Sequence, residues 1–162
     1  MTRALCTLSL QRVTTHKELP KSADFRAWIN VAMIVANYQF ASEVLIRIVD
    51  DEESQSLNGQ YRGKDYATNV LSFPSELPHE IAAAMTRAPL GDIIICAPVV
   101  MAEAKEQEKS LQSHWAHLTI HGVLHLLGYD HIDDDEAEQM EALEVQAMAL
   151  LGYSNPYTCD AA

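Results

Sequence analysis

Three histidines near the carboxyl end of the chain have the residue type and spacing of a metal site. His121, His125 and His131 fall at relative positions 0, 4 and 10, and Gly128 stands at position 7. Residues 111–127 lack proline and carry apolar residues at helical spacing, so His121 and His125 are expected one turn apart on one helix face. Gly128 is where this helix is expected to end, because glycine adopts the left-handed conformation of a helix C-terminus without strain. The chain can then fold back and bring His131 to the same ion.

Three protein ligands and one open coordination position are typical of a catalytic zinc site rather than a structural one. A lone histidine is usually a surface or satisfied core residue, and a pair at i, i+4 is ambiguous by itself. The helix-ending glycine and the third histidine make an accidental match much less frequent. The pattern therefore predicts one zinc ion per chain, held by His121, His125 and His131.

The same spacing occurs in the metzincin peptidases, whose motif is H-E-x-x-H-x-x-G-x-x-H. Those enzymes need a glutamate directly after the first histidine as general base, and this chain has Gly122 there. A zinc peptidase with this substitution would lack its proton acceptor. The ligand pattern is thus that of three-histidine zinc, while the peptidase base is absent.

Other polar groups near the motif have simpler explanations. His114 and His117 lie on the same expected helix and are interpreted as surface groups or as partners of the ligands, with His117 the stronger candidate because it is one turn from His121. The acidic residues 133–136 are interpreted as the start of a last helix, whose dipole stabilises negative charge, in preference to a second metal site.

The amino-acid composition restricts the cellular compartment and the kinds of binding partner that the protein can have. The formal net charge is −12, and residues 110–162 contain no lysine or arginine. A broad basic face that coats nucleic acid is therefore excluded, whereas a small cationic spot, to which zinc would add two charges, is not. The three cysteines form no Cys-x-x-Cys pair, and no signal-peptide core or membrane-spanning run is present. These features predict a cytoplasmic protein.

The order of elements predicts a single α+β domain over residues 1–162, with about four strands in a mixed sheet packed with helices. Its metal site is expected on a C-terminal helix and the following loop. Strands are expected at 6–11, 44–49, 68–73 and 90–96. Helices are expected from Ser22 as N-cap, from 50 to about 58–59, around 81–85, from Pro98 to about 109, over 111–127, and after 133–136. The last helix is expected to bury Met140, Leu143, Ala147 and Leu150, and to end at Gly152.

Residues 61–66 place basic groups between aromatic ones in an expected loop. Arg62 and Lys64 lie between Tyr61 and Tyr66. Cations beside stacking rings suit contact with phosphates and bases. A plain polar turn is the alternative, and composition alone leaves both open.

Residues 121–131 resemble the signature of the YbeY proteins, the zinc-dependent endoribonucleases of bacterial rRNA maturation. Further matches follow the family's order along nearly the whole chain, at residues 57–58, 61–65, 68–74 and 90–93. The first 20 residues and the tail after Tyr157 carry no motif.

The resemblance implies a compact α/β fold, zinc on His121, His125 and His131, and cleavage of single-stranded RNA. It implies a role in small-subunit rRNA 3′-end maturation and ribosome quality control. The implied partners are rRNA and the small ribosomal subunit, with neither DNA nor a membrane. The acidic surface favours basic ribosomal proteins as further partners. The important arginine of the family corresponds to Arg62.

As a mechanistic hypothesis, zinc activates water and polarises a phosphate oxygen, while Arg62 stabilises the charge of the transition state. Lys64 and Tyr61 would bind the substrate. Attack by the RNA 2′-hydroxyl in place of water stays open. Two other functions also stay open: a zinc metallopeptidase-like hydrolase, and a non-catalytic ribosome assembly factor with a structural zinc.

Overall fold

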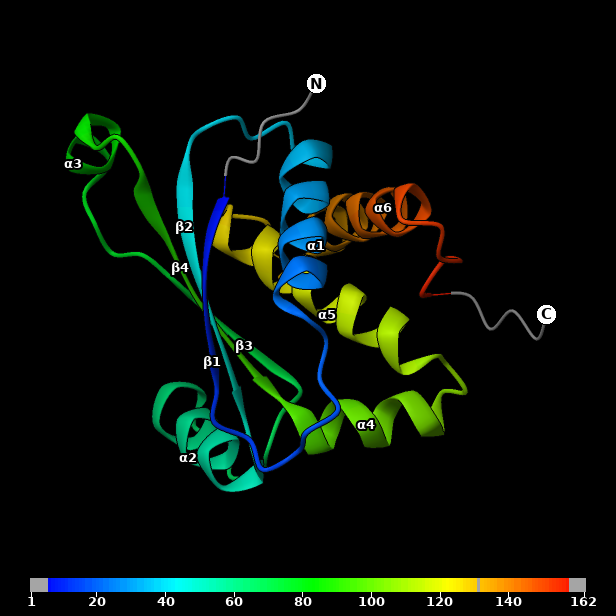
Figure 1. Ribbon diagram of the computed structural model, residues 1–162. Helices are drawn as coiled ribbons and strands as arrows, with labels where there is room; N and C mark the ends of the chain where they lie inside the picture. The colour runs from blue at the N-terminus through cyan, green and yellow to red at the C-terminus, as the bar shows by residue number, and fades with distance from the viewer. Residues whose placement is uncertain (1–5, 131, 158–162) are drawn as a thin grey trace.

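A four-stranded mixed sheet forms the centre of the computed structural model, which describes residues 6–130 and 132–157 (Figure 1). The strands lie in the order β1-β2-β4-β3. The first three in this order are parallel, and β3 pairs antiparallel with β4 at one edge. The strand bounds are β1 (Cys6–Arg12), β2 (Ser42–Val49), β3 (Val70–Pro74) and β4 (Ala88–Cys96). The predicted α+β class and four-stranded mixed sheet are confirmed.

Helices cover the sheet unequally. In the described residues they are α1 (Ser22–Val35), α2 (Asp51–Arg62), α3 (His79–Ala84), α4 (Ala97–Glu106), α5 (Leu111–Leu126) and α6 (Asp134–Leu150). Figure 1 shows α1, α5 and α6 gathered on one side of the sheet, and α2 apart from them near one end of the strands. No helix in the described ranges is long and apolar enough to cross a membrane.

The central strand β4 is buried on both faces, as its continuous apolar sequence predicts. Ile93 and Ile95 point into the main core, which α1, α5 and α6 share. Ile94 and Cys96 point the other way into a smaller cluster with residues of α2 and β3. The sheet is therefore the layer that separates the three-helix side from the α2 side.

Helix α5 has clear signals at both ends. The Ser110 side chain accepts a hydrogen bond from the backbone N–H of Ser113 and caps the first turn. Leu127 is the C-cap, and Gly128 follows with φ of +102°. The predicted end of the helix at this glycine is confirmed.

Helix α2 is longer than predicted, so Tyr61 and Arg62 lie in its last turn and not in a loop. The helix continues past Asn58 because the Asn58 side chain donates a hydrogen bond to the backbone oxygen of Tyr66, at 2.8 Å, and so faces inward. It ends at Gly63, whose φ of +69° is left-handed.

Two further helix details differ from prediction. Lys21, not Ser22, is the N-cap of α1, because the Asp24 carboxylate accepts the Lys21 backbone N–H at 3.0 Å and closes the first turn. Leu150 is 62% exposed, since the core at the end of α6 is filled by Met148 instead. The acidic start of α6 is confirmed, because the Asp133 side chain accepts the backbone N–H of Glu136.

Gly91 lies in β4 between the backbone of β3 and the Leu126 side chain of α5. Its φ is +147°, and an added Cβ would lie 2.4 Å from the Phe73 carbonyl oxygen and 2.7 Å from a methyl carbon of Leu126. We expect Gly91→Ala to lower the free energy of unfolding by about 2–3 kcal/mol, through backbone strain and overpacking. Urea unfolding would measure the loss.

Gly59→Ala is the matched control, because this helical glycine has only the Lys64 carbonyl oxygen near the added Cβ, at 3.6 Å. It is expected to leave stability unchanged or raise it by about 0.5–1 kcal/mol, since alanine favours helix. Equal losses in the two variants would contradict the packing explanation.

Candidate active site

His121 and His125 lie one turn apart near the end of α5, as predicted. Their Nε2 atoms are 3.1 Å apart, and both side chains are partly exposed. Two nitrogens bound to one tetrahedral zinc ion at about 2.0–2.1 Å would be about 3.3 Å apart. The observed separation therefore fits two ligands of one ion.

The third predicted ligand, His131, lies outside the described residues, and its role stays a prediction. Residues 128–130 lead toward it from the end of α5 and line the same groove as His121 and His125. Within the described ranges, no group of three or more His, Cys, Asp or Glu side chains is arranged to hold a metal ion. A three-ligand site here therefore depends on position 131.

A buried glutamate on α6, Glu144, supports His121. Its Oε1 atom lies 3.2 Å from Nδ1 of His121 and 2.6 Å from Nε2 of His117. Its Oε2 atom accepts a hydrogen bond from the Tyr157 hydroxyl at 2.8 Å. Because an ionised carboxylate only accepts hydrogen bonds, this contact places the hydrogen of His121 on Nδ1 and leaves the lone pair on Nε2. His121 is thus oriented as metal-ligating histidines are.

The charge of Glu144 is stabilised where it lies. Burial alone would raise its pKa, but hydrogen bonds from His117 and His121 lower the pKa to about 2. Burial, followed by the Glu144 charge, raises the pKa of the Tyr157 phenol. At neutral pH the pair is therefore a carboxylate acceptor and a hydroxyl donor.

Sequence reasoning missed Glu144. The signal was present, because this acidic residue lies one turn after Met140 and one turn before Met148, on the buried stripe of α6. A glutamate at such a position is almost never fully buried without a partner. Searching the apolar faces of helices for acidic residues would have found it.

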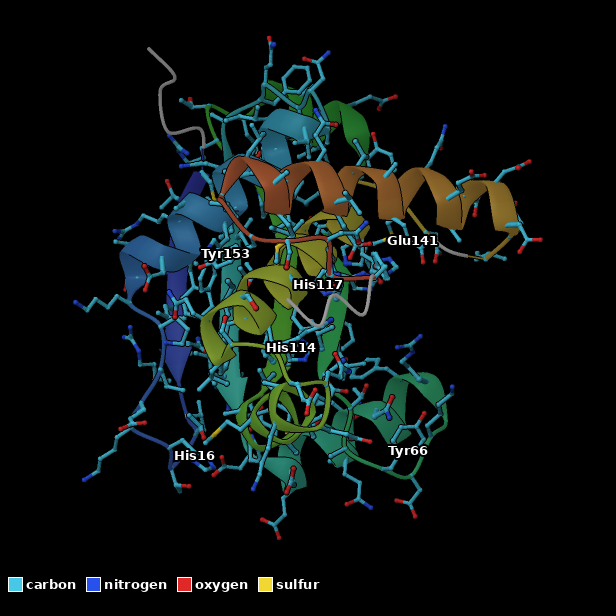
Figure 2. The ribbon with its side chains drawn as sticks, turned by 90° about the vertical axis from the view of Figure 1, so that its right-hand side faces the viewer. His16, Tyr66, His114, His117, Glu141 and Tyr153 are labelled. Carbon is cyan, nitrogen blue, oxygen red and sulfur yellow. The ribbon has the colours of Figure 1, made fainter. Side chains whose placement is uncertain are left out.

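Figure 2 labels the remaining two histidines of α5, His114 and His117. Each of them contacts a carboxylate. His117 contacts Glu144, as its spacing from His121 suggested. His114 is only 3% exposed, and its Nε2 atom lies 2.9 Å from Glu103 of α4. Glu103 also accepts hydrogen bonds from the amide of Asn69, which precedes β3.

A groove of about 720 Å³ joins the histidine pair to Arg62 and Tyr61. It follows the free edge of β3, between the end of α2 and the end of α5. Its lining includes His121, His125, Arg62, Tyr61, residues 68–74 and residues 128–130. The groove is open to solvent.

The α2 side of the groove is fixed by side chains that bind the following loop. Ser54 donates to the Thr68 carbonyl oxygen at 2.8 Å and accepts from the Thr68 N–H at 2.9 Å. Tyr61 packs edge to face against Phe73 of β3, with ring centroids 5.0 Å apart. Lys64 is exposed and is not among the residues that line the groove.

Comparison with known proteins decides the family. Residues 10–152 match the family model described as "Endoribonuclease YbeY". The chain belongs to the YbeY endoribonuclease family. YbeY proteins are metal-dependent hydrolases that act on RNA, so this chain is an endoribonuclease by family.

A solved structure supports the fold of this YbeY chain. It is the solution structure of TM1509 from Thermotoga maritima, described as a NESGC target protein. The two chains are 23% identical, and the match covers 93% of this chain and 99% of that one with a TM-score of 0.53. At this identity the similarity establishes the shared fold alone.

In this YbeY chain, Gly122 occupies the place of the peptidase base because α5 packs there directly on the sheet. An added Cβ would lie 3.0 and 3.1 Å from two side-chain carbons of Ile93 and 3.2 Å from the Ser72 hydroxyl, which itself donates to the Gly122 carbonyl oxygen. A glutamate at this position would face the sheet and not the histidine pair. Sequence, packing and family membership therefore agree against a peptidase.

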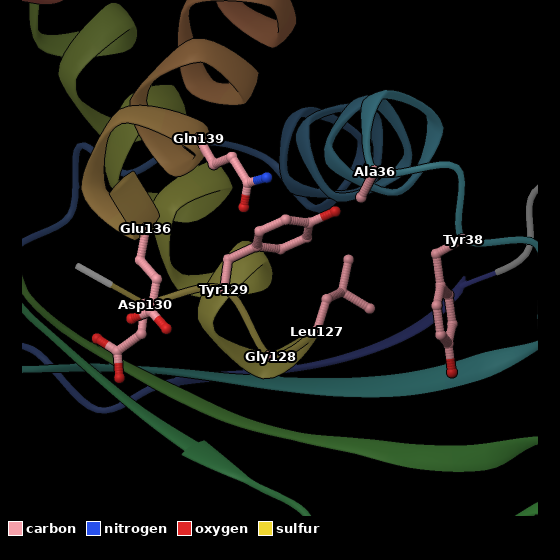
Figure 3. Close-up of a pocket in the computed structure, with 8 residues that line it drawn as sticks. All are labelled: Ala36, Tyr38, Leu127, Gly128, Tyr129, Asp130, Glu136 and Gln139. Atoms are coloured by element: carbon pink, nitrogen blue, oxygen red, sulfur yellow. The ribbon is translucent and has the colours of Figure 1, made fainter. Parts of the chain in front are cut away.

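A second cavity, of about 310 Å³, lies on the other side of the loop after α5 (Figure 3). Ala36 and Tyr38 line it from one side, and Glu136 and Gln139 from α6. Residues 128–130 line both cavities. The segment that leads to position 131 is thus the wall between them.

Proposed function

We propose that this YbeY-family chain is a zinc-dependent, single-strand-specific endoribonuclease acting in small-subunit rRNA 3′-end maturation and ribosome quality control. The observation that carries the proposal is the pair of imidazole nitrogens 3.1 Å apart, which opens onto the groove that Arg62 also lines. The groove runs beside an unpaired sheet edge, where an extended nucleic-acid strand has room to lie.

The metal would be held by His121, His125 and His131, with Glu144 orienting the first. Bound zinc supplies Lewis acidity toward a phosphate oxygen and makes water a stronger acid. Glu144 keeps the Nε2 lone pair of His121 directed into the groove. The domain over residues 1–162 would act as one unit, since α2, β3 and α5 all contribute to the groove.

Arg62 would bind the scissile phosphate. It lies in the last turn of α2 and is exposed toward the groove. The planar guanidinium group donates two parallel hydrogen bonds to phosphate oxygens and opposes the charge that develops on them. Lys64, which is exposed just beyond the helix, would contact the flanking RNA backbone.

No side chain in the histidine motif replaces the missing glutamate base, which leaves two routes for cleavage. In one, water attacks the phosphorus atom; in the other, the neighbouring 2′-hydroxyl attacks. The product ends distinguish them, because a 2′,3′-cyclic phosphate excludes direct attack by water. Mass spectrometry of the fragments would measure this.

The experiment that tests the function compares substrate classes. Zinc-loaded protein is incubated with a single-stranded RNA, the same sequence in a duplex, and a peptide library. We expect cleavage of the single strand, much slower cleavage of the duplex, and no hydrolysis of peptides. Equal cleavage of both RNAs would overturn strand specificity, and peptide hydrolysis without RNA cleavage would overturn the proposal.

Tyr61 would stack on an unpaired base. Its side chain is 59% exposed, and Phe73 supports the ring from behind. Stacking of a base on an aromatic ring contributes about 1–3 kcal/mol, so Tyr61→Leu is expected to weaken binding of single-stranded RNA roughly 5- to 150-fold. Tyr61→Phe should bind nearly as wild type does, because the ring is kept. Fluorescence anisotropy would measure both.

Tyr66→Leu is the matched control. Tyr66 belongs to the same aromatic and basic segment and is 54% exposed, but it is not among the residues that line the groove. Its loss is expected to change RNA affinity less than twofold. A similar loss of affinity in Tyr66→Leu and Tyr61→Leu would indicate that general surface change, and not stacking, is responsible.

The partners we propose are rRNA, the small ribosomal subunit and its basic proteins, in the cytoplasm. The acidic first turn of α6 and the absence of lysine and arginine after residue 109 favour basic protein contacts. Cys6 and Cys96 are free and buried, as suits a reducing compartment.

Co-sedimentation of the protein with purified small ribosomal subunits is expected at low salt, and its absence there would contradict the partner assignment. A non-catalytic assembly factor would co-sediment equally but cleave no RNA.

A further inference from the structure

The segment after α6 returns to the histidine site. Residues 153–157, which we call the C-terminal strap, follow α6 and lie beyond residues 10–152, the part that the family comparison covers. The Lys109 ammonium group donates to the Pro156 carbonyl oxygen at 2.7 Å, and the Tyr153 backbone N–H donates to the Met148 carbonyl oxygen at 2.9 Å. The strap is thus tied to both the start of α5 and the end of α6.

The strap ends at the buried carboxylate that supports His121. The Tyr157 hydroxyl donates to Oε2 of Glu144, and its ring meets His117 edge to face with centroids 5.4 Å apart. The other carboxylate oxygen of Glu144 receives the two histidines. Both oxygens of a side chain that is 1% exposed are therefore satisfied, and the donor to Oε2 comes from the strap.

Loss of the Tyr157 hydroxyl would leave one buried carboxylate oxygen without this donor. A carboxylate in that state rotates or recruits water, because an unsatisfied buried acceptor is unfavourable. Either change disturbs the hydrogen bond between Glu144 and Nδ1 of His121. This hydrogen bond sets the direction in which the Nε2 atom of His121 points. The effect reaches His121 through Glu144.

We propose that Tyr157 is a positioning residue of the active site: through Glu144 it holds His121 in the orientation that binds metal. This inference rests on the proposed zinc site. The C-terminal strap lies outside residues 10–152, which match the family model. The proposal is therefore that the affinity of this chain for metal depends on the strap.

The test measures zinc affinity of the full chain by competition with a chromogenic chelator. Tyr157→Phe keeps the ring and removes the hydroxyl, and we expect it to weaken zinc binding about tenfold, the lower end of what loss of an outer-shell partner costs. Glu144→Gln should weaken binding further, up to roughly 100-fold. Cobalt absorption spectra would report the altered ligand geometry directly, without reference to activity.

Tyr153→Phe is the matched control, since Tyr153 is in the same strap but packs on the core. It should bind zinc as wild type does. The ring of Tyr157 is itself 46% exposed, so the metal-free Tyr157→Phe protein is expected to melt within a few degrees of wild type.

The outcomes separate the two proposals. If wild type does not bind zinc, the proposed metal site fails and the inference fails with it. If wild type binds zinc and Tyr157→Phe binds equally well, only the inference is overturned. It is overturned as well if Tyr153→Phe loses as much affinity as Tyr157→Phe, or if the cobalt spectrum of Tyr157→Phe matches that of wild type.

Discussion

Removal of bound metal is expected to reduce RNA cleavage by at least about 1000-fold, and added zinc to restore it. Lewis-acid stabilisation of a phosphoryl oxygen contributes several kcal/mol to a transition state, and each 1.36 kcal/mol changes the rate about tenfold. The general-base glutamate of the peptidase motif is also missing, because position 122 holds a glycine packed against the sheet. The measurement is the initial rate on a fluorescent single-stranded RNA after dialysis against a chelator, and again after zinc is added.

Variants of α5 make the same test specific to the proposed site. His125→Ala should behave as the stripped protein does and should not recover with zinc. His114→Gln, on the same helix, should recover, because His114 contacts Glu103 and is not one of the paired histidines. Cleavage at the normal rate by stripped protein or by folded His125→Ala would contradict the metal assignment.

The parts of the site that lie within one helix could be predicted from the sequence. Helix periodicity and the glycine at 128 are local properties, so the placement of His121 and His125 and the end of α5 followed from them. The burial of strand β4 on both faces could also be predicted, since an unbroken apolar run indicates such burial.

The parts that depend on contacts between distant segments could not be predicted. The end of α2 was placed too early because the inward bond from Asn58 to the Tyr66 carbonyl oxygen, which lets the helix continue, has no local signal. That bond and those of Ser54 determine where Tyr61 and Arg62 face. The groove that they share with α5 is formed by the register of β3 on β4, which neither segment specifies alone.

An acidic protein can act on RNA when its positive charge is concentrated at the site of reaction. The net charge is −12, yet Arg62 lies in the groove and a bound zinc ion would add two positive charges beside it. Such a surface binds a strand weakly except where the reacting phosphate meets both cations. Productive binding then depends strongly on the single arginine.

Arg62→Ala is accordingly expected to lower kcat about 100- to 1000-fold, the usual cost of removing one donor that stabilises developing charge. Arg62→Lys should recover only part of the rate, because an ammonium group supplies charge but not the planar pair of donors.

Arg62 is exposed in the last turn of α2, and alanine favours helix, so the melting temperature of Arg62→Ala should change little. Arg26→Ala, at an exposed position of α1, is the control for lost positive charge and should leave kcat unchanged. If Arg62→Ala raises KM while kcat stays at the wild-type value, Arg62 binds RNA without stabilising the transition state, and the catalytic assignment is wrong.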